Sequence, residues 1–397
     1  MLKVLHIPKW FPTQNAPYDG IFVQRHIEAS SSFVNNYVIF ALAKTQKSWF
    51  ELEIEHQKVI VYYKKEIIGL QFIDKIIKIG LYFLALQKAY NCFFKHEKPS
   101  LVHVHVLLRT GIFAYFLQIT KQIPYVITEH WTGYLPEHKH YKGLFLHFLN
   151  KLIIKNANCI MPVSYHLQNA MQNFRKLKGN YTVVNNVVDN KIFYPQELVL
   201  NSQKKQIVMV ADMVIAHKNY ITILNSVQEL AKIRKDFKLT IFGEGPDKEL
   251  IFRFVSDNKL ADFIEFLGYQ TPQKIAKVMN ESAFLLLYSN YENAPCCISE
   301  AQFCGLPVLV SNVGGIPEMV SEKEGIVLEI TSPELLTSQL NLMLDNYLSF
   351  DSEHIVNISQ SRYNYKSVGE KLFKIYEESV KKLDKCFINI KRILQLI

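Results

Sequence analysis

Two carboxylates with seven residues between them, Glu292 and Glu300, are the pair in this sequence best placed to do chemistry. The apolar run 283–288 before them has the length of a buried parallel strand, and Pro295 suits the first position of a following helix. Glu292 then falls in a loop and Glu300 on the helix. Carboxylates beside helix-terminal N–H groups suit a polyhydroxylated, phosphorylated ligand. The alternative is that Glu292 caps the helix and Glu300 lies on a solvated face.

One lysine and several histidines are further candidates for chemistry. Lys218 lies at a strand-to-helix junction, where an ammonium group can meet a phosphate; the alternative is a surface lysine with no partner. His130 follows a predicted strand and is either a contact to a reacting group or a structural histidine. His103 and His105 share one face of a strand, but the sequence reveals no third ligand beside them, so we expect no metal site.

Three glycine-containing loops follow predicted strands. Gly20 ends a loop after the first strand, at the edge where open α/β sheets bind ligands, although it also fits a plain long connection. Gly243 begins a turn in which Lys248 replaces the third glycine of a dinucleotide fingerprint, so we expect no hydride-transfer cofactor. Gly314 and Gly315 form a turn whose backbone N–H groups could face a phosphate.

Short apolar segments alternate with amphipathic segments of helix length, a pattern typical of parallel α/β layers. We expect two α/β domains, residues 1–195 and 206–360, with the polar stretch 196–205 as linker and a last helix over 366–397. The predicted strands are Lys3–His6, Tyr37–Ala41, Val59–Tyr63, Leu101–Val106, Tyr125–Thr128, Cys159–Pro162, Thr182–Val184, Ile207–Ala211, Leu239–Phe242, Ala283–Tyr288 and Val308–Val310.

Composition limits the class of protein. The 397 residues are 49% hydrophobic and 20% charged, as in a globular chain of about two domains. The net charge of +9 favours anionic partners, but no nucleic-acid-binding signature accompanies it, so we expect no nucleic acid partner. Six cysteines without paired spacing, and an N-terminus unlike a signal peptide, indicate a cytoplasmic protein.

A basic segment from Lys58 to Lys98 carries eight lysines against three acidic residues, interleaved with aliphatic and aromatic side chains. Such a segment resembles a membrane-surface element, and the alternative is an amphipathic helix that covers a core. No apolar run reaches the roughly 18 to 20 residues that span a bilayer. The sequence therefore predicts a soluble protein, or one peripheral on the cytoplasmic face of the membrane.

A succession of motifs in the second half carries a family resemblance: Gly243-Glu-Gly-Pro246, Phe266-Leu-Gly268-Tyr269, Ser289 to Glu292, Glu300-Ala301, Gly305-Leu-Pro307-Val308 and Gly314-Gly315 with Glu318. Their order and spacing resemble the retaining GT-B-fold glycosyltransferases of family 4, also known as the group 1 type. Landmarks of the first half are similar to that family but weaker: Gly20-Ile-Phe-Val, Val102 to His105, Glu129-His130, Val163-Ser164 and Asn186 to Asp189 with Phe193.

The resemblance implies an α/β fold of the GT-B type, with two Rossmann-like domains facing each other across a cleft and a C-terminal helix that crosses back to the first domain. It implies transfer of a sugar, with retention, from a nucleotide sugar to a saccharide or lipid-linked acceptor in bacterial cell-surface polysaccharide or glycolipid synthesis. No metal and no cofactor would be needed, since the nucleotide-diphosphate sugar is a substrate.

Roles for single residues follow from the same resemblance. Catalytic contacts to the donor sugar or its diphosphate are implied for His130, Glu292 and Lys218. Contacts to the nucleotide sugar are implied for Gly20, Gly243, Asn293, Ala294, Cys296 and Glu300. Glu300 would hold the ribose hydroxyls.

The sequence also departs from the family pattern. Asp212 stands where the family usually has an arginine, which leaves Arg25 or His217 as substitutes for the missing cation. The segment 185–189 lacks the usual glycine. Two alternatives stay open: a non-catalytic nucleotide-sugar-binding protein, which Asp212 favours, and a GT-B nucleotide-sugar epimerase.

Overall fold

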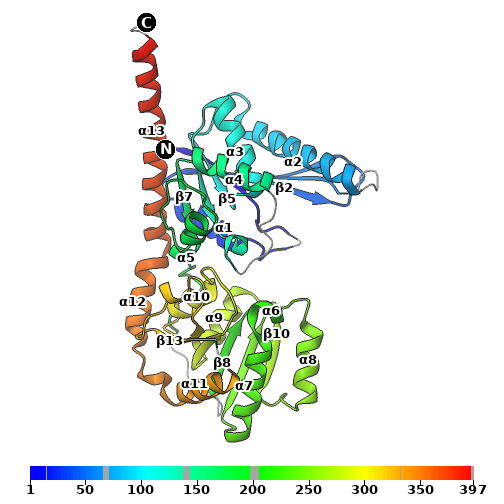
Figure 1. Cartoon of the computed structure of the whole chain (residues 1–397), viewed down its shortest axis with the longest axis vertical. Coiled ribbons are helices and arrows are strands. Elements are labelled where there is room, and N and C mark those ends of the chain that lie inside the picture. Colours follow the sequence, from blue (N-terminus) through cyan, green and yellow to red (C-terminus); the bar gives the residue numbers. More distant parts are fainter. Residues whose placement is uncertain (15, 66–70, 137–143, 197–204, 331, 395–397) are drawn as a thin grey trace. The chain divides into compact units, whose positions relative to one another are not determined.

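The computed structural model describes residues 1–394 except 15, 66–70, 137–143, 197–204 and 331. It divides into two compact units (Figure 1). Unit 1 comprises Met1–Val163, Gln168–Val184 and Tyr365–Ile397, and unit 2 comprises Ser164–Leu167 and Asn185–Asn364.

Unit 1 is built around a seven-stranded sheet. Its strands are β1 (Lys3–Pro8), β2 (Asn35–Lys44), β3 (Phe50–Glu55), β4 (Lys58–Lys64), β5 (Leu101–His105), β6 (Tyr125–Glu129) and β7 (Cys159–Pro162). They lie in the order β3-β4-β2-β1-β5-β6-β7, and the described pairs are parallel except β3 with β4. The chain order reverses between β1 and β5. The carboxyl ends of these two strands therefore lie at the position where open α/β sheets commonly bind ligands.

Helices cover the sheet of unit 1. They are α1 (Ile21–Ser30), α2 (Gln71–Phe94), α3 (Leu108–Lys121), α4 (Leu144–Asn156) and α13 (Tyr365–Leu394), with short helical turns at Thr132–Tyr134 and Ala170–Phe174; α5 (Tyr165–Asn169) spans the division between the units. α2 packs on β2 and β4 and buries one side, including Leu81, Leu86 and Tyr90. Many apolar residues of the basic segment 58–98 are therefore buried, either in β4 or on the side of α2 that packs on the sheet. This favours the alternative of a helix that covers a core.

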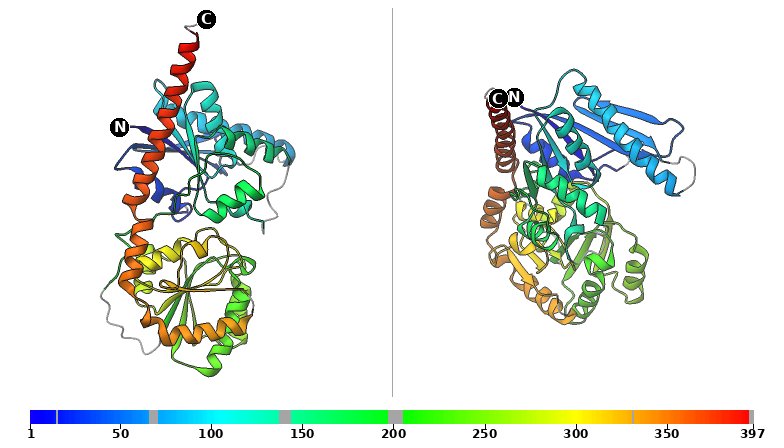
Figure 2. Two further views of the ribbon diagram at one scale, coloured as in Figure 1. Left: turned by 60° about the vertical axis from the view of Figure 1, so that its left-hand side comes forward. Right: turned by 45° about the horizontal axis from the view of Figure 1, so that its top comes forward.

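The last helix, α13, belongs to unit 1 although it is last in the chain (Figure 2). Its Val368, Leu372 and Tyr376 recur on one face and are buried, and the helix packs against α1. A Cβ atom at Gly369 would overlap the carbonyl oxygen of Ala29, so glycine permits this close approach. The C-terminal helix therefore crosses back to the first domain, as expected.

Unit 2 contains a six-stranded parallel sheet. Its strands are β8 (Lys205–Val210), β9 (Phe237–Phe242), β10 (Ile264–Gly268), β11 (Phe284–Leu287), β12 (Val308–Ser311) and β13 (Gly325–Leu328). They lie in the order β10-β9-β8-β11-β12-β13, so the chain order reverses between β8 and β11. Val208, Ile241, Leu286 and Leu309 are fully buried, as expected for parallel strands covered on both faces.

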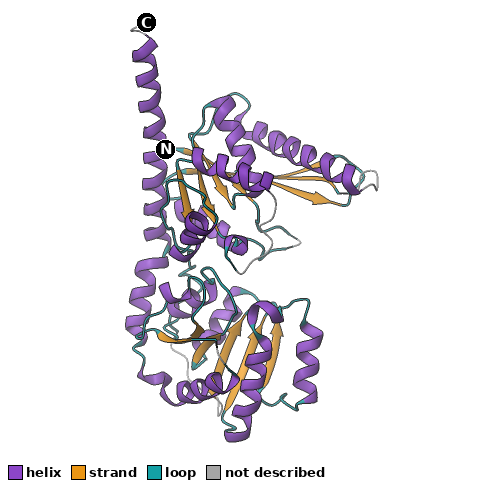
Figure 3. Cartoon of the chain, viewed as in Figure 1, coloured by secondary structure: helices purple, strands orange, loops and turns teal. Residues whose placement is uncertain are grey.

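Helices lie on both sides of this sheet (Figure 3). They are α6 (Ile215–Lys218), α7 (Tyr220–Ile233), α8 (Lys248–Asp257), α9 (Pro272–Asn280), α10 (Cys296–Phe303), α11 (Pro333–Asn346) and α12 (Ser352–Tyr363), with 3-10 turns at Ile316–Glu318 and Tyr347–Ser349. Thr271, Ser332 and Asp351 accept hydrogen bonds at the starts of α9, α11 and α12. These side-chain caps fix where the helices begin.

Most predicted strands are confirmed, with ends shifted by a few residues. Thr182–Val184 is not a strand: it hydrogen-bonds to the backbone of β7, but only Tyr181 forms an isolated bridge there. β3, β10 and β13 were not predicted, because β3 alternates with glutamates and the other two are short and carry glycines. The expected linker 196–205 falls mainly on 197–204, outside the described residues.

Within the described chain, we find no helix with the length and apolar character needed to cross a membrane.

Candidate active site

A lysine and a glutamate meet at the strand-order reversal of unit 2. Lys218 ends α6, which follows β8, and Glu292 lies in the loop after β11. Nζ of Lys218 lies 2.5 Å from Oε1 of Glu292, and their side chains are only 11% and 8% exposed. The alternative of an unpartnered surface lysine is therefore wrong. The pair lies at the edge where open α/β sheets bind ligands.

Two serines hold Glu292 in place. Oγ of Ser289 donates to Oε1 of Glu292 at 2.8 Å, and Oγ of Ser311 donates to the carbonyl of Ser289 at 2.7 Å. Burial opposes the charged form of Lys218, but the charge and hydrogen bond of Glu292 outweigh it and raise the pKa of Lys218 above its usual value. Lys218 is therefore a fixed ammonium group at neutral pH.

His217 binds the loop that carries Glu292. Its ring stacks on Tyr291 at 4.2 Å, and its Nε2 lies 2.9 Å from the Tyr291 carbonyl, which can only accept a hydrogen bond. Burial, and then the charge of Lys218, lower the pKa of His217. The imidazole is thus neutral near pH 7. His217 therefore does not substitute for the arginine that Asp212 replaces.

The start of α10 presents the residues between the two glutamates. Glu300 lies on this helix and is buried, so the alternative of a solvated face is wrong. The position that precedes the helix, Pro295, makes no side-chain cap, and the described partners of Glu292 are the side chains above rather than helix N–H groups. Nδ2 of Asn186 donates to the Ala294 carbonyl at 2.9 Å, which anchors this turn. The sequence motif contained Asn186 but gave no sign of this role.

Glycines let neighbouring loops approach this segment closely. Gly314 has φ +58°, and a Cβ there would overlap the carbonyl of Glu292. A Cβ at Gly315 would overlap the carbonyl of Asn293. In the same way Gly243, with φ +139°, faces the backbone of Ala211, next to the exposed Asp212. Gly314 and Gly315 thus act by close backbone packing against the segment that carries Glu292, and Gly243 acts in the same way on the segment after β8.

In unit 1, His130 and Gly20 lie near each other at the corresponding edge. Gly20, in the left-handed conformation, precedes α1. The Phe22 ring of α1 lies 4.5 Å from the His130 ring, and the His26 ring lies 5.4 Å from it. Glu129 is buried and accepts backbone N–H bonds from Leu107, His130 and Trp131. These bonds hold the turn after β6, from which His130 projects.

The His103–x–His105 pair is not isolated. His6 lies beside it to form one group of imidazoles, and His26 with His130 forms a second group around His105. The structure therefore supplies the third imidazole that the sequence did not reveal. Burial lowers the pKa of His6 to about 4, and the pKa values of His103, His105 and His130 lie well below the usual range for the same first reason. These four imidazoles are neutral at physiological pH.

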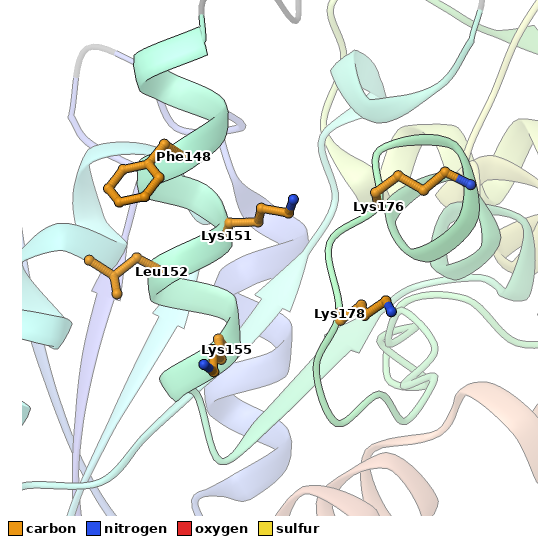
Figure 4. Close-up of a pocket in the computed structure, with 6 residues that line it drawn as sticks. All are labelled: Phe148, Lys151, Leu152, Lys155, Lys176 and Lys178. Carbon is orange, nitrogen blue, oxygen red and sulfur yellow. The ribbon is translucent and has the colours of Figure 1, made fainter.

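A basic pocket of about 590 Å³ opens beside α4 in unit 1 (Figure 4). We call it the lysine pocket; it is lined by Phe148, Lys151, Leu152, Lys155, Lys176 and Lys178. Its four ammonium groups form no ion pair with any carboxylate in the described part of the chain. α4 ends just before β7 begins, so its last turn lies toward the amino edge of the sheet, away from the edge that carries His130.

Two family models match consecutive parts of the chain. "Glycosyltransferase Family 4" matches residues 61–191, and "Glycosyl transferases group 1" matches residues 190–362. N-acetyl-alpha-D-glucosaminyl L-malate synthase of Bacillus anthracis is 27% identical over 57% of this chain and 60% of its own length. One subunit of the human phosphatidylinositol N-acetylglucosaminyltransferase is 26% identical over 59% of this chain and 50% of its own length. The matched region thus spans less than two thirds of the length of each of these two relatives.

A solved structure supports the same fold. Anabaena Alr3699/HepE in complex with UDP and glucose superposes with a TM-score of 0.71 at 12% identity, covering 94% of this chain and 99% of that one. Its likeness shows the GT-B fold of two parallel-sheet, Rossmann-like α/β domains. Together with the two family models, it shows that the chain belongs to the GT-B glycosyltransferases of family 4.

Proposed function

We propose that the protein is a retaining glycosyltransferase that moves a sugar from a nucleotide-diphosphate donor to a saccharide or lipid-linked acceptor. The observation that carries the proposal is the buried Lys218–Glu292 pair at the strand-order reversal of unit 2, with Glu300 on the helix that follows. The UDP and glucose bound to HepE, which has the same fold, support a donor of this class.

The donor would be held by complementary charge and hydrogen bonds. Lys218 carries N–H donors beyond the one that faces Glu292, and these would meet the diphosphate. Glu292 and the backbone of Asn293, Ala294 and Cys296 would contact the sugar and diphosphate, while Glu300 would accept from the ribose hydroxyls. Charge developing on the leaving diphosphate is then offset by a preorganised ammonium group, and the transfer needs no metal or cofactor.

Unit 1 would supply the acceptor side. His130 would reach the donor sugar, and Gly20 would lie in the loop near the phosphates. An acidic residue, Asp212, at the exposed end of β8 would weaken diphosphate binding compared with an arginine there.

The lysine pocket supports contact with an anionic membrane surface, which would supply a lipid-linked acceptor. Its four ammonium groups lie beside the exposed Phe148, a combination that suits an anionic, partly apolar membrane surface. The predicted membrane element, segment 58–98, suits such a surface less well, because α2 buries apolar side chains against the sheet. We therefore propose that the enzyme acts in bacterial cell-surface polysaccharide or glycolipid synthesis, peripheral on the cytoplasmic face of the membrane. The name of the human relative, which includes phosphatidylinositol, is consistent with this class of acceptor.

The substitution Glu300→Gln tests the donor site. A hydrogen bond to a charged group contributes about 1.5–3 kcal/mol, so donor affinity should fall roughly ten- to a hundredfold. Thermal shifts with UDP-, GDP- and ADP-sugars identify the donor, and hydrolysis of that donor is then compared between variants. Glu249→Gln, an exposed glutamate in the first turn of α8, is the matched control and should leave both readouts unchanged.

Unchanged donor turnover in Glu300→Gln would contradict the site. Tight nucleotide binding by the natural protein without donor hydrolysis or transfer would favour the non-catalytic alternative. An epimerised nucleotide sugar formed without any acceptor would favour the epimerase.

A further inference from the structure

Hydrogen bonds fix the proton positions in the histidine cluster of unit 1. Nδ2 of Asn36 donates to the carbonyl of Ile27 at 2.8 Å, so its Oδ1 faces Nε2 of His6, also at 2.8 Å. Because that oxygen can only accept, Nε2 of His6 carries the proton. The neutral His6 then presents a bare Nδ1, which accepts from Nε2 of His105 at 3.0 Å.

This chain of bonds leaves one lone pair on His105. With its proton on Nε2, His105 has a bare Nδ1, and this atom is buried with no hydrogen-bond partner among the described residues. A buried acceptor without a partner costs about 1–3 kcal/mol. Such an atom in a native fold calls for a ligand or another explanation.

Two other imidazoles surround that position. Ring nitrogens of His26, His105 and His130, one from each, all lie within 4.8 Å of one another. They come from α1, from the end of β5 and from the turn after β6, which meet at the strand-order reversal of unit 1. His26 and His105 are fully buried, whereas His130 is half-buried, so the group is open on one side.

We propose that His26, His105 and His130 bind one divalent transition-metal ion of the zinc type, with Nδ1 of His105 as the fixed ligand. Three imidazoles with an open fourth position form a common zinc arrangement, with metal–nitrogen distances of about 2.0–2.1 Å. Tetrahedral ligands at that distance are roughly 3.3 Å apart, so the rings need only close by on the order of 1 Å. The His6–Asn36 pair is the outer partner that orients a metal-bound histidine.

His103 belongs to a different part of the cluster. Its Nδ1 lies 2.7 Å from the Tyr376 hydroxyl and its Nε2 lies 2.6 Å from Oγ1 of Thr128, so both ring nitrogens are engaged. The alternative group of His6, His103 and His105 would have to break these bonds and the His6–His105 bond. The group around Nδ1 of His105 breaks none of them.

Metal binding would affect catalysis through His130. If His130 reaches the donor sugar, an ion held by the same imidazole blocks that contact, and zinc inhibits transfer. This consequence rests on the proposed function, but the binding itself does not. The two are separated because binding is measured on the protein without donor or acceptor.

The experiment is a Co²⁺ titration of the full-length, chelator-treated protein, followed by visible absorption and then by Zn²⁺ displacement. We expect one equivalent of Co²⁺ with imidazole rather than thiolate absorption bands, released by one equivalent of Zn²⁺. His105→Gln keeps an amide donor toward His6 but lacks Nδ1, and His130→Gln changes a half-buried ligand; both should lose the site. Asn36→Leu should weaken binding roughly ten- to a hundredfold.

Controls separate this site from other histidines and cysteines. His103→Gln and the exposed His96→Gln should keep the site, and Cys92→Ser removes an exposed thiol from the measurement. Near-ultraviolet circular dichroism confirms that each variant is folded. The proposal is overturned if the natural protein binds no stoichiometric metal, if folded His105→Gln and His130→Gln bind it unchanged, or if His103→Gln alone loses it.

Discussion

At the scale of single residues, the donor-side candidate depends on a charge pair that is largely withdrawn from water. Lys218 and Glu292 come from loops after different strands and are 74 positions apart in the chain. Each compensates the charge of the other at low exposure, because an isolated buried charge is costly. The pair therefore contributes to the stability of the free protein, whatever its role toward a donor.

Removing one partner should expose this dependence. Lys218→Met leaves the Glu292 carboxylate buried without its cation, so we expect a loss of about 3 kcal/mol in the free energy of unfolding, measured with urea. Because the pKa of Lys218 is raised, the contribution is complete below pH 10.5 and is lost only as the pH rises through the higher folded value. The loss should thus be the same at pH 7 and pH 9.

Two further variants control this measurement. Lys248→Met breaks the half-exposed pair with Glu244 and should cost less than about 1 kcal/mol. The double variant Lys218→Met/Glu292→Gln should recover much of the loss, because no buried charge remains. Equal effects at Lys218 and Lys248 would contradict the assignment of a buried pair.

At the scale of elements, loop packing around the glutamate segment depends on glycine. Gly314→Ala introduces a Cβ in a left-handed conformation and against the Glu292 carbonyl, so unfolding free energy should fall by roughly 2 kcal/mol and donor affinity should fall as well. Gly80→Ala is the matched control: Gly80 lies exposed on α2 with open space around it, and the change should stabilise the helix by about 0.5–1 kcal/mol. Effects of the same sign at both positions would contradict this explanation.

The lysine pocket on α4 makes a second prediction at this scale. Each lysine near an anionic surface contributes about 1 kcal/mol, so Lys151→Gln/Lys155→Gln should weaken binding to phosphatidylglycerol vesicles roughly thirtyfold. Lys259→Gln/Lys274→Gln removes two exposed lysines of unit 2 and should have a much smaller effect in the same sedimentation assay. Equal losses in both variants would indicate an attraction by net charge alone.

At the scale of the whole molecule, the last helix, α13, belongs to the same unit as the N-terminal strand β1 and packs against α1. Gly369→Val should push α13 from α1 and destabilise unit 1 by at least about 2 kcal/mol, since the new side chain overlaps the Ala29 backbone. Hydrogen exchange should accelerate in β5 and β6 but not in β11 and β12. Lys371→Val, on the exposed side of α13, should change neither sheet. Faster exchange in both sheets would show that the units unfold together.

The sequence by itself determined the α/β class, most of the strands and the order of the glycine and glutamate motifs. These features are local: a buried parallel strand needs a short apolar run, and a close backbone approach needs glycine at a particular place. For the same reason β3, whose glutamates alternate with apolar residues at a sheet edge, escaped prediction.

Only the tertiary structure decided which side chains meet. It paired Lys218 with Glu292, buried Glu300, made His217 a neutral hydrogen-bond donor, and gathered His6, His26 and His130 around His105. No spacing in the chain encodes these contacts. They arise because parallel strands bring the ends of distant segments to one edge, where charge state and partner depend on burial and on neighbours far away in sequence.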